Sequence, residues 1–190
     1  MIFLRLYLLT GLIVHKLVWQ VTKRRTAGSA SPATSDTTAF ADLAKAGKAT
    51  IVILLVAQTL GLQIAPIMSE PHRLQVVGVV IYTLGLAVAI LGRLQLGDNW
   101  SDIEAARIRP QHAVVSAGVY RYIRHPIYAG DLLSLVGFEL ALNSWLVLGV
   151  AFLLPVVVDR ALREERMLAA ALPDYVAYCT RTKRFVPYVV

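Results

Sequence analysis

Residues 49–68 form an unbroken run of 20 residues without a charged side chain, ATIVILLVAQTLGLQIAPIM. A helix of this length is about 30 Å long, which matches the hydrocarbon core of a bilayer. A second uncharged run covers residues 74–92. Backbone polar groups cannot stay unpaired in lipid, so a run that crosses a membrane must be helical. Because 57% of the chain is hydrophobic and only 16% is charged, we predict an all-α integral membrane protein.

The apolar segments predict about five transmembrane helices, and hence a polytopic protein. Three of these helices fall in the first half of the chain, at about residues 3–22, 49–68 and 74–96. The other two form a C-terminal helical hairpin over residues 129–159, because Asn143 and Ser144 interrupt the apolar sequence near its middle.

The whole chain, 1–190, is expected to form a single membrane domain. Its N-terminal part, 1–96, holds three helices and a linker at 23–42 that is rich in small and polar residues. Its C-terminal part, 97–190, forms a core made of a polar connector, the hairpin and a tail.

Lysine and arginine alternate strictly between rich and poor loops. The segment between the first two helices, the connector and the tail are rich in both, whereas the loop 69–73 has one arginine and the hairpin turn has none. Positive residues are enriched on the cytoplasmic side of inner and plasma membranes. Five spans therefore place the N-terminus outside and the C-terminus inside, with the connector and the tail together on the cytoplasmic face.

The net charge of +7 fits basic loops that set topology and contact membrane lipids. The chain has no basic stripe with interleaved aromatic residues, so we expect no nucleic-acid partner. Cys179 is the only cysteine, which excludes a disulfide framework within the chain and a cysteine metal cluster. No metal site is expected.

Residues 118–133, GVYRYIRHPIYAGDLL, place tyrosine, arginine and histidine directly before an apolar segment. Lipid gives no reason to concentrate donors and cations there, whereas a bound polar ligand does. Pro126 suits the first turn of a helix, whose free N–H groups favour an anion. After the hairpin, Arg160 and Glu164 lie four residues apart and share one helix face.

Each feature taken alone also has a purely structural interpretation. Arg-His pairs and tyrosines anchor helices at the membrane interface, and Glu164 and Glu165 among arginines suit a solvated face. Glu139 is expected at the outer interface rather than as a functional acid within the membrane, and His15 is expected to snorkel. The seven-residue repeat predicts close helix packing at Gly78, Gly85 and Gly92.

The combination of motifs is more specific than any one of them. The chain carries GVYRYIRHPIYAG, a hydrophobic hairpin, EERML and LPDYVAYCTRTKRFVP in this order over residues 111–187. In this it resembles the isoprenylcysteine carboxyl methyltransferases and their relatives, a group that includes membrane phospholipid and small-thiol methyltransferases. The resemblance implies that 97–190 is a methyltransferase core with a cytoplasmic site for S-adenosyl-L-methionine.

The same resemblance implies roles for individual residues. Arg160 is expected to hold the substrate carboxylate, and Glu165 is a second candidate catalytic residue. The expected cofactor contacts are His112, Ala113, Val114, Val115, Tyr120, His125, Pro126, Ile127, Tyr128 and Glu164. Glutamate can pair with the cofactor's ammonium group, and tyrosine faces suit its sulfonium and adenine groups.

The methyl acceptor implied by the resemblance is lipidic or prenylated, and the most similar activity is O-methylation of an isoprenylcysteine carboxylate. A carboxylate is ionised at neutral pH and needs no base. Two alternatives stay open at the level of sequence. One is a methyltransferase for a phospholipid amine, which needs a base such as Glu165 or His125, or for a small thiol. The other is a non-catalytic membrane binding protein or transporter-like bundle.

Overall fold

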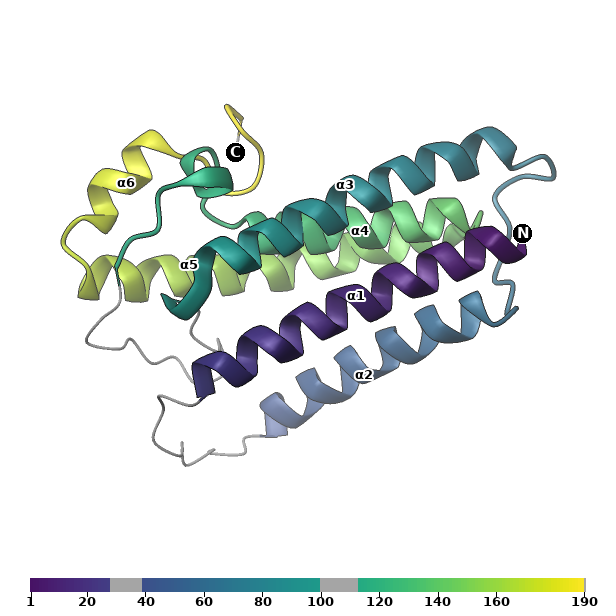
Figure 1. Ribbon diagram of the computed structural model, residues 1–190, viewed down its shortest axis with the longest axis horizontal. Helices are drawn as coiled ribbons and strands as arrows, with labels where there is room; N and C mark the ends of the chain where they lie inside the picture. The colour runs from purple at the N-terminus through teal and green to yellow at the C-terminus, as the bar shows by residue number, and fades with distance from the viewer. Residues whose placement is uncertain (28–38, 100–112, 190) are drawn as a thin grey trace.

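The computed structural model describes residues 1–27, 39–99 and 113–189, and these residues form no β-strand beyond two isolated bridges. The elements are helices α1 (Ile2–Ala27), α2 (Ala39–Thr59), α3 (His72–Leu96), α4 (Pro126–Ala141), α5 (Leu154–Ala171) and α6 (Tyr175–Arg181), with 3-10 segments η1 (Gly97–Asn99), η2 (Gly118–Arg121) and η3 (Trp145–Leu153). The five long helices run along the long axis of the molecule, and α6 and the tail lie at the end opposite the N-terminus (Figure 1).

The predicted glycine repeat is an interhelical contact between α3 and α4. A Cβ atom on Gly78 would lie 2.2 Å from the backbone nitrogen of Ala141, and one on Gly85 would lie 2.4 Å from that of Ser134. The glycines of α4 face α3 in the same way, since a Cβ on Gly137 would lie 2.1 Å from the backbone nitrogen of Tyr82. Only glycine permits such a close approach of two backbones. The packing prediction is therefore confirmed.

A small apolar core joins four of the long helices at the N-terminal end of the bundle. Its buried members come from α1, α2, α3 and α4: Leu8, Leu55, Tyr82, Phe138 and Ala141. Tyr82 also donates a hydrogen bond of 2.9 Å to the carbonyl oxygen of Leu8, which satisfies its buried hydroxyl group. This core holds α1 and α2 against the α3–α4 pair.

The second helix ends earlier than the hydropathy predicted, at Thr59 rather than residue 68. Gly61, with φ of 126°, and Ala65, with φ of 39°, bend the apolar chain away from the helical path. The bent segment pairs with the α4–η3 turn, because the backbone N–H of Trp145 donates to the carbonyl oxygen of Ala65 at 3.0 Å. The apolar residues of this segment are mostly exposed, so hydropathy alone does not show where the helix ends.

The structure bears out the hairpin turn at Asn143 and Ser144. Asn143 adopts a left-handed conformation with φ of 57°, which asparagine tolerates better than most residues. Its side-chain amide donates to the carbonyl oxygen of Met68 at 2.7 Å, and its Oδ1 accepts from the N–H of Met68 at 3.1 Å. The turn is thus fastened to the segment that follows α2.

Two polar residues in the bundle have partners that the sequence did not predict. Glu139 is 5% exposed and accepts a hydrogen bond of 3.0 Å from Gln58 of α2. His15 has a partner on α4, since its Nε2 lies 3.0 Å from Oδ1 of Asp131. In both cases a partner on another helix makes a polar contact that a single helix cannot supply.

Three helical segments are long and apolar enough to cross a membrane: Ile2–Arg24, His72–Leu96 and Trp145–Ala171. The apolar part of α2, Ala46–Thr59, is shorter, and the 16 residues of α4 reach only about 24 Å. The helices α1 and α2 also extend into 23–42, the range that the sequence assigns to a linker. The described residues thus form an all-helical fold with three candidate membrane spans.

Candidate functional site

The start of α4 is fixed by its sequence and by the C-terminal tail. Pro126 occupies the first turn, as predicted, and His125 is the residue at the N-cap. The backbone N–H of Arg124 donates to the carbonyl oxygen of Lys183 at 2.7 Å, and that of His125 donates to the carbonyl oxygen of Arg184 at 3.0 Å. The Arg-His-Pro step therefore lies beside the tail, although about 60 residues separate them in sequence.

Three of the predicted cofactor residues meet between α4 and α5. The hydroxyl group of Tyr128 donates to Oε2 of Glu164 at 3.4 Å, and Nδ1 of His125 lies 3.8 Å from the same oxygen. The rings of His125 and Tyr128 stack with centroids 5.6 Å apart. His125 is buried, whereas the side chain of Glu164 is 25% exposed. One carboxylate oxygen of Glu164 thus lies near both rings, while its side chain remains partly exposed.

Tyr120 reaches the same region from η2. Gly118 has φ of 61°, and a Cβ atom there would lie 2.3 Å from the side chain of Gln95, so glycine permits the turn that delivers Tyr120. Tyr120 is 5% exposed. Its burial, followed by the nearby charge of Glu164, raises the pKa of its hydroxyl group. Tyr120 therefore carries a neutral phenol beside an acid at physiological pH.

Arg160 lies one helical turn before Glu164 on α5, and its charge acts on the hydroxyl group of Tyr128. It is half-buried, and no carboxylate of the described residues lies within 4 Å of its guanidinium group. The cluster thus contains a cation that is available to an anionic ligand.

Glu165 has different surroundings from its neighbour. Its Oε1 accepts from Nε of Arg124 at 2.8 Å and lies 3.2 Å from Nε2 of His125. Nε of Arg184 lies 3.1 Å from both carboxylate oxygens. Arg124 also donates to the carbonyl oxygens of Cys179 and Thr182. Glu165 therefore joins α5, the Arg-His-Pro step and the tail.

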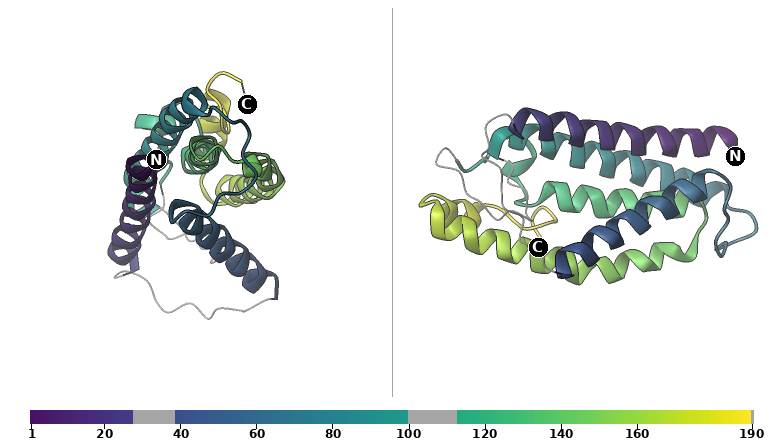
Figure 2. Two further views of the ribbon diagram at one scale, coloured as in Figure 1. Left: turned by 90° about the vertical axis from the view of Figure 1, so that its right-hand side faces the viewer. Right: turned by 90° about the horizontal axis from the view of Figure 1, so that it is seen from below.

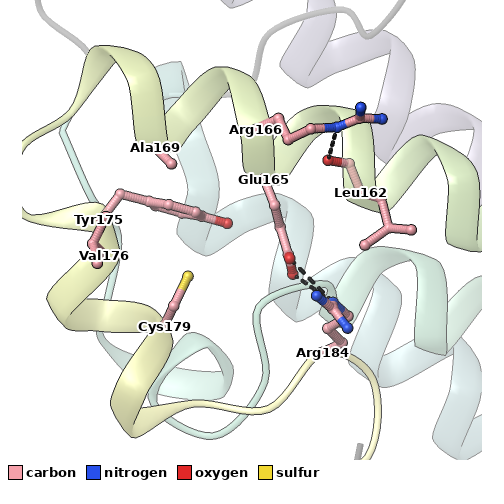
Figure 3. Close-up of a pocket in the computed structure, with 8 residues that line it drawn as sticks. All are labelled: Leu162, Glu165, Arg166, Ala169, Tyr175, Val176, Cys179 and Arg184. Atoms are coloured by element: carbon pink, nitrogen blue, oxygen red, sulfur yellow. Dashed lines mark hydrogen bonds and ion pairs between the residues drawn. The ribbon is translucent and has the colours of Figure 1, made fainter.

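A hollow of about 500 Å³ lies between α5 and α6 beside this junction (Figure 3). Its mostly apolar wall includes Leu162, Tyr175 and Val176, with Arg184 and Glu165 at its polar side. Glu165 is the one predicted site residue that lines it. None of His125, Tyr128 and Glu164 lines the hollow, but Glu165 contacts His125, so the hollow and the cluster are adjacent rather than identical.

The remaining predicted residues are less directly connected to the cluster. Pro126 and Ile127 pack against α3, since a Cβ on Gly92 would lie 3.2 Å from each side chain. Ala113 donates its N–H to Oδ1 of Asn99 at 2.9 Å. Among the described residues no hydrogen bond joins Ala113, Val114 or Val115 to the cluster, and His112 lies outside the described residues.

The sequence did not single out Arg184 or Tyr178. Arg184 belongs to a basic tail whose register beside Ile123 is set by a single parallel bridge to Lys183, and no local pattern predicts such a contact. The Tyr178 hydroxyl donates to the carbonyl oxygen of Tyr120 at 2.7 Å. Burial raises the pKa of Tyr178 to about 12. Tyr178 belongs to the LPDYVAYCTRTKRFVP motif, but the motif does not predict this hydrogen-bond partner.

The described residues contain no group of three or more histidine, cysteine, aspartate or glutamate side chains that could hold a metal ion. Their fold and cluster define a helical membrane protein with a polar, aromatic and acidic site at one end of the bundle. The phospholipid methyltransferase family matches residues 74–174, more than half of the chain and most of this site. The chain belongs to this family, which confirms the family prediction.

Individual relatives match over similar regions. The chain is 33% identical over 109 residues to the cobalt-zinc-cadmium resistance protein CzcN of Cupriavidus metallidurans, which covers 55% of this chain and 46% of that protein. It is 30% identical over 120 residues to the protein-S-isoprenylcysteine O-methyltransferase B of Arabidopsis thaliana, which covers 57% of this chain and 60% of that protein. The chain thus spans about half the length of these curated relatives.

A solved structure has a similar fold. The eukaryotic intramembrane Ras methyltransferase, an isoprenylcysteine carboxyl methyltransferase, superposes with a TM-score of 0.58 at 20% identity. The match covers 81% of this chain and 55% of that chain. The arrangement of helices is therefore that of a known membrane methyltransferase, including regions of the chain that lie outside the family match.

Proposed function

We propose that this chain is an integral membrane methyltransferase that uses S-adenosyl-L-methionine, and that it methylates the carboxylate of a prenylated cysteine. The observation that carries the proposal is the convergence of His125, Tyr128 and Glu164 from two helices within a chain of the phospholipid methyltransferase family. Relatives named as isoprenylcysteine O-methyltransferases support this choice of acceptor.

The residues of the cluster fit the proposed cofactor. Glu164 offers a partly exposed carboxylate for the ammonium group, and the partly exposed Tyr128 offers an aromatic face for a sulfonium cation or an adenine ring. His125 has both ring nitrogens near carboxylates, which fixes its orientation. When bound, S-adenosyl-L-methionine supplies an activated methyl group. The protein's part is to hold this group and the acceptor in line.

Arg160 supports a carboxylate acceptor. Its guanidinium group can bind a carboxylate through two parallel hydrogen bonds, and it lies on the same face of α5 as Glu164. In this proposal Arg160 is the group that contacts the substrate, and Glu165 positions Arg124 and His125. Neither residue has to act as a base, because the acceptor carboxylate is already ionised at neutral pH.

A phospholipid amine is the second candidate acceptor, because the family that contains this chain is named for phospholipid methylation. An ammonium acceptor has to lose a proton first. Glu165 accepts bonds from two arginines and contacts His125, so it is poorly placed to take up that proton. This geometry argues against Glu165 as the base that an amine acceptor needs.

The proposed site lies on the cytoplasmic face of the membrane. In this arrangement α2 and α4 cross together with the three longer spans, which gives five crossings with the N-terminus outside and the C-terminus inside. The basic connector and tail are then cytoplasmic. The proposed methyltransferase core is 97–190, and the helices of 1–96 support it through α3. A site at the surface can take a lipid tail from the membrane and a cofactor from water.

Transfer of a labelled methyl group to a panel of acceptors tests the proposed activity. The purified full chain is given S-adenosyl-L-methionine with an N-acetyl farnesylcysteine, phosphatidylethanolamine or a simple thiol. We expect a base-labile ester on the prenylated cysteine, and we expect Arg160→Gln to raise the KM for that acceptor about tenfold or more. Label appearing only as a base-stable product on the amine or thiol would contradict the carboxylate assignment.

A further inference from the structure

Three cationic side chains from separate segments surround a second, small hollow of about 100 Å³. Arg121 comes from η2, Arg181 ends α6, and Lys183 belongs to the tail. Tyr122 and Tyr188 complete most of the wall. We call these five residues the tail patch. Their convergence is a product of the fold, since about 60 residues separate the two parts of the patch.

The cations of the tail patch have no acidic partner among the described residues. No carboxylate lies within 4 Å of Arg121, Arg181 or Lys183, in contrast to Arg124 and Arg184, which both contact Glu165. All three patch cations are exposed. Three like charges around one small hollow repel one another, and an anion between them removes this repulsion.

The patch lies where a span leaves the membrane. The N–H of Val119, two residues before Arg121, donates to Oε1 of Gln95 at 2.8 Å, and Gln95 is in the last turn of α3, a candidate span that ends at Leu96. Tyr122 is 49% exposed and Tyr188 is 84% exposed. Exposed tyrosines are typical of the headgroup level of a bilayer.

The tail is shaped to bring Tyr188 to this hollow. Tyr188 has φ of 67°, a left-handed conformation that is costly for a bulky residue. The N–H of Val189 donates to the carbonyl oxygen of Val186 at 3.3 Å and closes the turn. An aromatic ring held by a strained turn beside three cations is not explained by packing, because the ring is almost entirely exposed.

We propose that the tail patch binds the phosphate headgroup of an anionic phospholipid. The hollow admits a group of the size of a phosphate and is too small for a nucleotide, while arginine pairs with phosphate oxygens through two hydrogen bonds. The membrane next to α3 supplies such lipids at high local concentration. This site does not depend on the proposed methyltransferase activity.

Binding of a lipid at the tail patch also stabilises the candidate site. Lys183 donates its N–H to the carbonyl oxygen of Tyr122 at 3.2 Å, and its own carbonyl oxygen accepts from Arg124 at 2.7 Å. The two backbone segments that carry the patch, at Tyr122 and at Lys183, therefore also hold Arg124 and the adjacent His125. A lipid that bridges Arg121 and Lys183 holds the tail against the Arg-His-Pro step.

Binding of short-chain lipids to the detergent-solubilised full chain tests this proposal. Dioctanoyl phosphatidylglycerol is titrated in parallel with dioctanoyl phosphatidylcholine, and binding is followed by calorimetry and native mass spectrometry. We expect one preferred phosphatidylglycerol site. The Arg121→Gln/Lys183→Gln variant is expected to bind it about thirtyfold more weakly, from about 1 kcal/mol for each cation. Its backbone hydrogen bonds are unaffected by the substitutions.

The matched control is Lys16→Gln/Arg24→Gln, which removes two exposed cations from α1 and leaves the patch intact. This control is expected to bind phosphatidylglycerol like the wild type. Equal affinity for the two lipids, or equal weakening in the control, would overturn the proposal. Displacement of the lipid by an equal concentration of inorganic phosphate or of an oligoglutamate peptide would also overturn it, and would assign the patch to a free anion or an acidic protein.

Discussion

Glu164 and Glu165 are neighbours in the sequence, and their carboxylates have different tasks. Glu165 contacts Arg124, His125 and Arg184, and its side chain is 12% exposed. Among the described residues, the polar side-chain partners of Glu164 are His125 and Tyr128, and its side chain is 25% exposed. The carboxylate of Glu165 is already surrounded by donors, whereas the carboxylate of Glu164 can still bind a cationic group of a ligand. In the proposed function, Glu165 is therefore the structural residue of the pair and Glu164 the one that binds the cofactor.

Glu165→Gln is expected to loosen the tail. The substitution removes the charge that attracts Arg124 and Arg184, and hydrogen bonds to charged groups contribute about 1.5–3 kcal/mol each. Local opening of the tail should therefore become at least about tenfold more frequent. The measurement is the rate of tryptic cleavage within 181–184, which contains Arg181, Lys183 and Arg184.

The control for this experiment is Glu70→Gln, which removes one exposed carboxylate from the loop at the opposite end of the bundle. Its cleavage rate in the tail should equal that of the wild type. An unchanged rate in Glu165→Gln as well would show that the junction at Glu165 does not hold the tail.

At the scale of elements, the α3–α4 pair is the rigid part that positions the site. Because its backbones touch through glycines over its whole length, α4 cannot shift along α3 without steric clashes. The site residues His125 and Tyr128 lie at the first turn of α4. Their position relative to α3 and to η2, which packs on the end of α3, is therefore fixed by helix packing.

Gly137→Ala is expected to destabilise the protein strongly. A Cβ atom there would lie 2.1 Å from the backbone nitrogen of Tyr82, so the two helices have to separate. Overpacking of this kind costs about 1–3 kcal/mol or more. Gly149→Ala in η3 is the matched control, because a Cβ there meets nothing within 4 Å. Thermal unfolding in detergent should show a lower Tm for Gly137→Ala only; equal Tm values would contradict the packing.

The elements also show what the sequence could and could not predict. The glycine repeat of α3, Pro126 at a helix start and the turn at Asn143 follow local rules, and the structure contains all three. The early end of α2 was missed because residues 60–68 remain apolar beyond Thr59, and hydropathy does not reveal the bend or the backbone hydrogen bonds to the α4–η3 turn. The Arg184–Glu165 contact was missed because it depends on a distant bridge rather than on any periodic pattern.

At the scale of the whole molecule, the proposed topology has the two ends of the bundle on opposite sides of a membrane. Figure 2 shows the N-terminus at one end of the long helices and α6 at the other. The chain has a single cysteine, Cys179 in α6, and the exposed Ser69 lies in the loop between α2 and α3. These two positions report on the two ends separately.

Labelling of intact cells with a membrane-impermeant maleimide tests the orientation. Burial raises the pKa of the Cys179 thiol, so the reaction is run at about pH 9. We expect Cys179 to react only after the cells are permeabilised. The Ser69→Cys/Cys179→Ser variant should react in intact cells. The opposite pattern would invert the topology, and labelling of both sites in intact cells would contradict a membrane-spanning bundle.

The proposed function depends on binding of S-adenosyl-L-methionine by the cluster of His125, Tyr128 and Glu164. The most direct measurement is calorimetric titration of the purified full chain with this cofactor. We predict one site in the wild type and at least about tenfold weaker binding in each of His125→Ala, Tyr128→Ala and Glu164→Gln, from the loss of contacts with a charged ligand. Wild-type affinity in all three variants, with Tm values equal to that of the wild type, would contradict the account.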